Sequence, residues 1–262
     1  MTARAQPAAE PFSAPGPSPG GPSPGGARGG ALVLHGFTGS PASVRGVAEA
    51  LAHAGLAVEL PVLPGHGTTV EDLARTRWSH WAAAAEAAYL SLAERCEEVA
   101  VVGLSMGGSL ACWLAEHHPV AGLVLVNPLV EPDEGLRAAG LELLAGGTAV
   151  ASGIGSDIAK PGVRDESYDA TPIEAGLSLL EAVGQVGADL AKIHCPVLLF
   201  SSRQDHVVAP SNGDRVASSV GGELERVWLE RSYHVATLDF DRELVEERTV
   251  AFVTGLLARV SP

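Results

Sequence analysis

Strand-like and helical patterns alternate along most of the chain. Short, mostly apolar runs typical of buried strands stand at residues 31–34, 56–60, 99–102, 122–126, 197–200 and 224–229. Segments with helical spacing of apolar positions lie between them, at residues 44–54, 78–95, 109–117, after Pro210 and 243–259. Strands buried on both faces lack polar alternation, so this order predicts a parallel sheet with crossover helices on both faces. Because crossover handedness is nearly fixed, we expect an open, doubly wound, mostly parallel α/β sheet.

Two regions depart from this alternation. Residues 1–30 are rich in Pro, Gly, Ser and Ala and contain a near-repeat of Pro-Ser-Pro-Gly-Gly. Such a segment buries too little surface to offset its chain entropy, which predicts a disordered tail. Residues 129–190 mix helix and loop. Because ligands of such sheets bind at the carboxyl ends of the strands, we interpret residues 129–190 as a small cap over those ends. The core then comprises residues 31–128 and 191–262.

Composition narrows the function classes. The chain has 262 residues, of which 46% are apolar, enough for one domain with a large core and an insertion. Its formal net charge of −14 repels nucleic acids and anionic lipids, so neither is expected as a standing partner. Cys96, Cys112 and Cys195 lie in or beside apolar runs without ligand-type spacing, which predicts free, buried thiols in a reducing compartment. With no apolar stretch of bilayer length and no signal-peptide core, we expect a cytoplasmic protein.

The segment Gly-Leu-Ser-Met-Gly-Gly at residues 103–108 carries the strongest chemical signal. It follows an apolar strand pattern and opens an Ala- and Leu-rich helical one. A serine on such a tight strand-to-helix turn is a nucleophile elbow. The turn leaves no space for side chains two positions before and after the serine, where Gly103 and Gly107 stand. The new helix directs its N-terminus at a developing oxyanion. We therefore predict Ser105 as a catalytic nucleophile.

A serine hydroxyl needs a base, and the base needs a carboxylate to orient it. In this architecture the chain order is serine, acid, histidine. Asp205 follows the strand pattern at 197–200, and His234 follows the one at 224–229, so both fall at the same edge of the sheet. They are the predicted acid and base. The alternative interpretations are a turn aspartate and a surface-loop histidine. Most other aspartates between the elbow and His234, such as Asp157, Asp165 and Asp169, fall in the cap.

The place of a residue in the chain also predicts the oxyanion donors and the roles of several other histidines. One donor should be the Met106 amide, and the other the Phe37 amide in the loop after the first strand. His35 is expected to shape that pocket, whereas His66 either lines the pocket mouth or holds a turn. His206 is excluded as the base because it neighbours the acid. His117 and His118 end a helix, where imidazole suits the helix dipole. No His, Asp and Glu set has metal-ligand spacing, so we expect neither a metal nor another cofactor.

These segments together resemble a known family. From residue 31 to the last helix the chain resembles the α/β-hydrolases, and within them the bacterial monoacylglycerol lipases and the small bacterial carboxylesterases. The resemblance rests on residues 35–39, 64–68, 103–108, 115–119, 204–208 and 232–239. The first and third of these mark only the superfamily. The last two, together with residues 154–157, are similar to the monoacylglycerol lipase group.

The resemblance implies the α/β-hydrolase fold and the same triad and oxyanion donors. It also implies a mobile apolar cap that guides one acyl chain, with Ile154 facing the substrate, and at most transient membrane contact through the cap. Asp165, or Glu166 beside it, matches a family glutamate that contacts the glycerol end. The cap leucines Leu136, Leu141, Leu143 and Leu144 are candidates for the acyl tunnel.

The expected reaction is hydrolysis of a monoacylglycerol to glycerol and fatty acid. A broad short- or medium-chain carboxylesterase, a thioesterase or a lactonase would share the triad and differ in the cap. A haloalkane dehalogenase would carry aspartate at the elbow. A non-catalytic binding protein with this fold would not need Ser105, Asp205 and His234 together.

Overall fold

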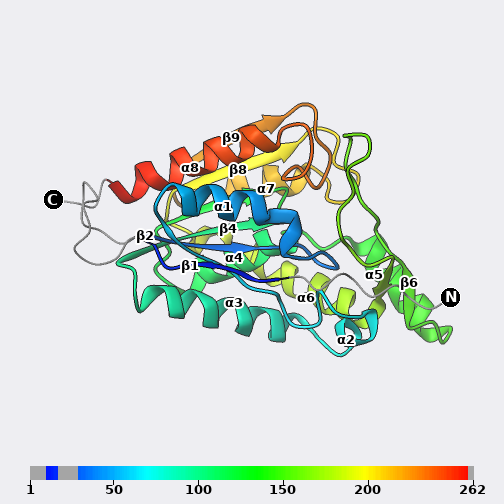
Figure 1. The fold of residues 1–262 in the computed structure, drawn as a ribbon. Helices are drawn as coiled ribbons and strands as arrows, with labels where there is room; N and C mark the ends of the chain where they lie inside the picture. The colour runs from blue at the N-terminus through cyan, green and yellow to red at the C-terminus, as the bar shows by residue number, and fades with distance from the viewer. Residues whose placement is uncertain (1–9, 17–28, 259–262) are drawn as a thin grey trace.

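A seven-stranded sheet forms the centre of the computed structural model, which describes residues 10–16 and 29–258 (Figure 1). The strand order is β1-β3-β2-β4-β5-β8-β9, and all neighbours are parallel except β1 and β3. The strands are β1 (Phe12–Ala14), β2 (Gly29–Leu34), β3 (Ala57–Leu60), β4 (Glu98–Leu104), β5 (Gly122–Val126), β8 (Val197–Ser202) and β9 (Leu224–Leu229). The predicted doubly wound, mostly parallel sheet is confirmed.

Helices cover both faces of this sheet (Figure 1). On one face, α1 (Arg45–His53) packs beside α8 (Arg242–Ala258). The other face carries α3 (Trp78–Ala93), α4 (Met106–His117) and α6 (Ile173–Asp189). The shorter helices are η1 (Pro41–Val44), α2 (Val70–Ala74), η2 (Leu190–Lys192) and α7 (Ser211–Ser219).

The two faces explain the continuous apolar runs in the sequence. In β4, Val99 and Val101 belong to the core beneath α3 and α4, whereas Ala100 and Val102 belong to the core beneath α1 and α8. Successive side chains of a strand point to opposite faces, and here both faces are covered. If polar and apolar residues alternated along these strands, the polar side chains would be buried in one of the two cores.

An edge strand corrects the prediction of a disordered tail over residues 1–30. Phe12–Ala14 pairs antiparallel with β3, with Phe12 opposite Leu60. The Arg45 guanidinium lies 5.2 Å from the centroid of the Phe12 ring, and Ser13 Oγ donates a hydrogen bond to Glu59 at 2.8 Å. These contacts with distant residues offset the loss of chain entropy on ordering this segment. The composition of the segment alone does not indicate them. Residues 29–30 likewise belong to β2, and residues 1–9 and 17–28 of the predicted tail lie outside the described residues.

The cap, which comprises residues 129–190, follows β5 and precedes β8 in the sequence, and the part labelled α5 and β6 lies at the right of Figure 1. It contains α5 (Glu134–Ala145), a two-stranded antiparallel sheet of β6 (Val150–Ser152) and β7 (Ala170–Pro172), and α6. Helix α6 packs against α5 and also against α3 and α4. Its residues Leu179, Val183 and Val186 are part of the core. The cap therefore shares one helix with the layer beneath it.

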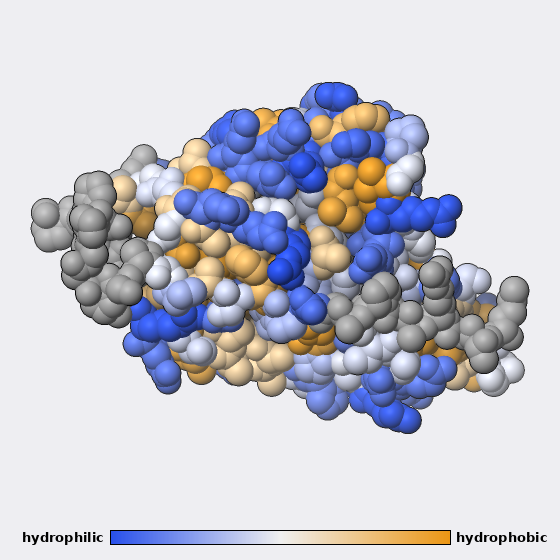
Figure 2. Space-filling view, in the orientation of Figure 1, coloured by the Kyte–Doolittle hydropathy of each residue, from blue (hydrophilic) through white to orange (hydrophobic). Residues whose placement is uncertain are grey.

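The surface shown in Figure 2 is mixed. Hydrophilic side chains predominate over α1 and α8, and the apolar residues on this face form separate patches. Within residues 10–16 and 29–258, no helix has the length and hydropathy needed to cross a bilayer. Of the cysteines, Cys96 and Cys112 are buried and Cys195 is half-buried.

Candidate active site

Ser105 sits on a strained turn between β4 and α4. Its backbone has φ 55° and ψ −118°, a region that side-chain-bearing residues rarely adopt. A Cβ at Gly103 would lie 2.1 Å from the carbonyl oxygen of Gly107, and a Cβ at Gly107 would lie 2.1 Å from that of Leu34. Both glycines are therefore required for the chain to turn here. The turn directs Ser105 into the cavity under the cap.

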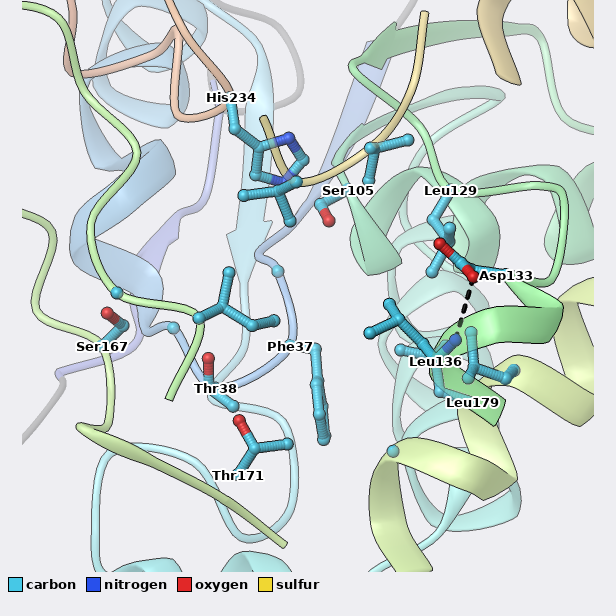
Figure 3. A pocket seen from close by; sticks show the side chains of 18 of the residues that line it. Phe37, Thr38, Ser105, Leu129, Asp133, Leu136, Ser167, Thr171, Leu179 and His234 are labelled. Carbon is cyan, nitrogen blue, oxygen red and sulfur yellow. Dashed lines mark hydrogen bonds between the residues drawn. The ribbon is translucent and has the colours of Figure 1, made fainter. Parts of the chain in front are cut away.

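The loops after β8 and β9 bring Asp205 and His234 together. His234 Nδ1 donates a hydrogen bond to Asp205 Oδ2 at 2.7 Å, and the side chains are only 8% and 2% exposed. Asp205 Oδ1 accepts from the amides of Val207 and Val208 at 2.9 and 2.8 Å. The carboxylate is thus fixed on both oxygens. With a proton on Nδ1, the imidazole presents a basic Nε2. Figure 3 shows His234 beside Ser105 at one end of the cavity.

The two predicted oxyanion donors, Phe37 and Met106, lie in segments next to Ser105. Phe37 lies in the loop between β2 and η1 and lines the cavity, and Met106 is the first residue of α4. Among the residues that the structure describes, neither N–H donates a hydrogen bond to another protein group. The Met106 amide also lies at the positive end of the α4 dipole. We keep the pair as the predicted donors to an oxyanion formed beside Ser105.

His35 supports the Phe37 loop from behind instead of lining the cavity. Its Nδ1 donates to the Gly36 carbonyl at 2.9 Å, and its Nε2 accepts from the Leu63 amide at 3.2 Å. His66 Nδ1 donates to the Pro64 carbonyl at 3.1 Å, which favours the turn-holding interpretation over the pocket mouth. Burial lowers the pKa of His35 to about 4 and that of His66 to about 3. Both rings are therefore neutral at pH 7.

The cavity under the cap has a volume of about 460 Å³. Its walls are mainly apolar and come from both the cap and the core (Figure 3). Ile154, which is 52% exposed, lies on this cavity, as do Leu136 and Leu143. Leu141 and Leu144 of the same helix are not among the lining residues. The sequence analysis missed the α6 contribution of Gly176, Leu177, Leu179 and Leu180, although the long apolar helix pattern there could have indicated it.

Asp165 places a carboxylate on this apolar cavity. Its Oδ1 is buried and has no hydrogen-bond partner among the described residues. Burial raises the pKa of the Asp165 carboxyl to about 6, and the nearby charge of His234 partly opposes that shift. Glu166 is exposed and is not among the lining residues. Of the two candidates from sequence, Asp165 is the one that faces the cavity.

Asn127 is a site residue that the sequence analysis did not identify. Its side-chain amide donates to the carbonyl of His234 at 2.8 Å and to Ser202 Oγ at 2.9 Å, and its Oδ1 accepts from the Ser202 amide at 2.8 Å. Asn127 thereby joins the end of β5 to the end of β8 and to the His234 loop. The available signal was a polar residue directly after a fully apolar strand.

The described part of the chain contains no group of three His, Cys, Asp or Glu side chains arranged to hold a metal ion. The chemistry that the site offers is that of a serine hydroxyl, an oriented imidazole and backbone amides.

Comparisons with known proteins identify the family of the chain. Residues 31–247 match the model of the alpha/beta hydrolase family. A thermostable monoacylglycerol lipase of Bacillus sp. strain H-257 is 44% identical over 85% of this chain and 89% of its own length. A carboxylesterase of Bacillus subtilis strain 168 is 27% identical over 86% and 92%. A structure from the work on LipS and LipT, two metagenome-derived lipolytic enzymes, is 41% identical with a TM-score of 0.87, covering 96% of this chain and all of that one.

Replacing Gly107 with alanine should distort the turn at Ser105. The added methyl group would meet the Leu34 carbonyl, so we expect the free energy of unfolding to fall by about 1–3 kcal/mol in urea titrations. Gly255→Ala is the matched control because a Cβ there meets no atom within 4 Å, and it should raise stability by roughly 0.5–1 kcal/mol. A Gly107→Ala protein as stable as the wild type would contradict the steric requirement.

Asp165 should make stability depend on pH. Its carboxyl has a pKa of about 6 in the folded chain, above the ordinary value of 3.8 that applies to the unfolded chain. Between these values the folded chain holds a proton that the unfolded chain releases, so this group lowers the free energy of unfolding as pH rises. Urea titrations from pH 4 to 7 should therefore show Asp165→Asn gaining stability relative to wild type up to about pH 6. A difference that stays constant or shrinks over this range would refute the assignment.

Proposed function

Since the chain belongs to the alpha/beta hydrolase family and is a carboxylic ester hydrolase, we propose that it cleaves monoacylglycerols to glycerol and a fatty acid. The proposal rests on one observation above all, the buried hydrogen bond from His234 to Asp205 beside Ser105. A neutral imidazole held in this tautomer is the base that a serine nucleophile requires. The similarity to a monoacylglycerol lipase supports the choice of substrate.

The reaction follows from the positions of these groups. Ser105 Oγ attacks the ester carbonyl carbon while His234 Nε2 takes the hydroxyl proton, and the resulting oxyanion accepts hydrogen bonds from the Phe37 and Met106 amides. His234 then gives the proton to the departing glycerol oxygen, which leaves an acyl-enzyme. Water attacks this ester as His234 takes its proton, and the fatty acid leaves as Ser105 regains one. Asp205 stays ionised throughout and holds the imidazole.

The cavity fits a substrate with one acyl chain and a polar end. Its apolar walls suit the chain, with Ile154 at the open side. Asp165 can accept hydrogen bonds from the glycerol hydroxyls, because it is a carboxylate on this cavity whose Oδ1 is buried and lacks a protein partner among the described residues. The cap's exposed Leu136, Leu141 and Leu143 would permit transient contact with a lipid surface. We keep the cytoplasmic location as a prediction.

A broad carboxylesterase is the second candidate function. The similarity to the Bacillus subtilis carboxylesterase favours it, and it needs the same triad without a dedicated glycerol contact. The two functions differ in how much the glycerol group contributes to substrate binding. A non-catalytic binding protein would leave Ser105 unreactive.

A fluorophosphonate probe tests the nucleophile. The probe should label wild-type protein covalently, and Ser105→Ala should abolish labelling because the attacking oxygen is gone. Ser91→Ala is the control, since Ser91 is exposed on α3, and it should label like wild type. Intact-mass measurement with peptide mapping reports both stoichiometry and site. Well-folded wild type that takes up no probe would instead support a binding protein.

Asp165→Ala tests the substrate. The variant should lose about tenfold in kcat/KM toward a monoacylglycerol, because a hydrogen bond to a charged group is lost. It should keep its kcat/KM toward the p-nitrophenyl ester of the same fatty acid, which has no glycerol hydroxyls. Steady-state rates on this matched pair decide the point. Equal losses on both esters, or none on either, would favour the broad carboxylesterase.

A further inference from the structure

A short part of the cap is tied to the loop that carries His234. We call residues 157–160 the strap. The amides of Ala159 and Lys160 donate to the Asp239 carboxylate at 2.7 and 2.9 Å. In the opposite direction, the Val235 amide donates to the Asp157 carbonyl at 3.1 Å. The strap and the His234 loop are therefore joined by contacts that both segments supply.

The Asp157 side chain adds a link to a second loop. Its Oδ2 accepts from the amide of His234 at 3.0 Å and from the amide of His206 at 3.1 Å. Its Oδ1 accepts from His206 Nδ1 at 2.8 Å. One carboxylate of the cap thus binds the backbone of His234 and that of the residue after Asp205. Only 14% of the Asp157 side chain is exposed, whereas the His206 side chain is 58% exposed. The bond to the His234 amide is therefore the more buried of these contacts.

These two loops have to keep a fixed separation. The hydrogen bond from His234 to Asp205 spans the gap between them, and each loop follows a different strand. Asn127 holds the His234 loop to the end of β8 from the core side. Asp157 holds the same loops together from the cap side. Small displacements of catalytic groups lower the reaction rate by large factors. The second set of contacts, made by Asp157, therefore has a direct consequence for the reaction.

His206 completes this arrangement. Its ring lies edge-on to Tyr233, with centroids 4.5 Å apart and an interplanar angle of 85°. Because Tyr233 precedes His234, both partners of Asp157 also contact each other through their loops. The histidine next to the predicted acid therefore serves as a donor to the cap, and is not a competitor for the role of base.

We propose that Asp157 is a positioning residue that couples the cap to the acid and base loops of the proposed serine hydrolase site. Its carboxylate holds the amides of His206 and His234 at one point, so seating the strap and aligning the acid–base pair are one event. The inference rests on the proposed function for its kinetic consequence. Its structural part, the alignment of His234, can be measured in the absence of turnover.

The test compares Asp157→Asn with Asp169→Asn. Both remove one carboxylate from the cap, but the Asp169 side chain is exposed and makes none of these contacts. Asp157→Asn should lower kcat about tenfold, to the same extent for acetate, octanoate and palmitate p-nitrophenyl esters, with KM little changed. Asp169→Asn should match wild type. The downfield proton resonance of His234 Nδ1–H should shift or broaden only in Asp157→Asn.

Each outcome bears on the proposal. A loss confined to the KM of long-chain esters would show that Asp157 shapes only the acyl cavity, and would overturn the proposal. So would kcat values and a proton resonance equal to those of Asp169→Asn. If Asp157→Asn does not fold, His206→Ala removes one of the three bonds and should lower kcat about threefold at unchanged KM. Folded wild type without esterase activity would reject the proposed function, and the proton resonance would then decide the role of Asp157.

Discussion

The close approach of α4 to the end of β2 is the constraint on which the site depends. Gly107 packs against the Leu34 carbonyl and Gly103 against the Gly107 carbonyl, at distances that exclude any side chain. This contact forces Ser105 into its positive-φ conformation and starts α4 directly after it. The positions of the proposed nucleophile, of the Met106 amide and of the N-terminus of α4 therefore all follow from this one contact. Without this contact, the remaining polar groups would surround a serine that points elsewhere.

The parallel pairing of β5, β8 and β9 positions the other polar residues of the site. It aligns the carboxyl ends of three strands, so Asn127, Asp205 and His234 meet although they are far apart in sequence. Burying so many polar groups is costly unless each has a partner. Most of them are paired here, through side-chain amides, backbone N–H groups and Asp157 of the cap. Among the described residues that line the cavity, Asp165 Oδ1 and Thr171 Oγ1 are the exceptions, and a substrate hydroxyl would supply the missing bond at Asp165.

Sequence reasoning succeeded where the signal was local. The strands at residues 122–126 and 224–229 coincide with β5 and β9. Strand propensity acts over a few neighbours, and β5 is in addition buried along its whole length. The nucleophile elbow could also be predicted from the sequence, because the tight turn requires glycines at positions close to the serine. Asp205 and His234 could be selected by their place after strands, and the structure brings them into hydrogen-bond contact. Strand β1 was missed because its pairing with β3 depends on residues far along the chain. The sequence did not predict that Asn127 and Asp157 hold the loops of the site together. Their hydrogen-bond partners are mainly backbone groups far away in the sequence, which carry no sequence signal.

A crystal structure of the protein inactivated by a long-chain alkyl phosphonate would test the central claim most directly. The account predicts a covalent bond from phosphorus to Ser105 Oγ, with the phosphoryl oxygen about 3 Å from the Phe37 and Met106 amides. The alkyl chain should lie in the cavity beneath the cap. Density for the phosphonate on another side chain, or a phosphoryl oxygen directed away from both amides, would contradict it.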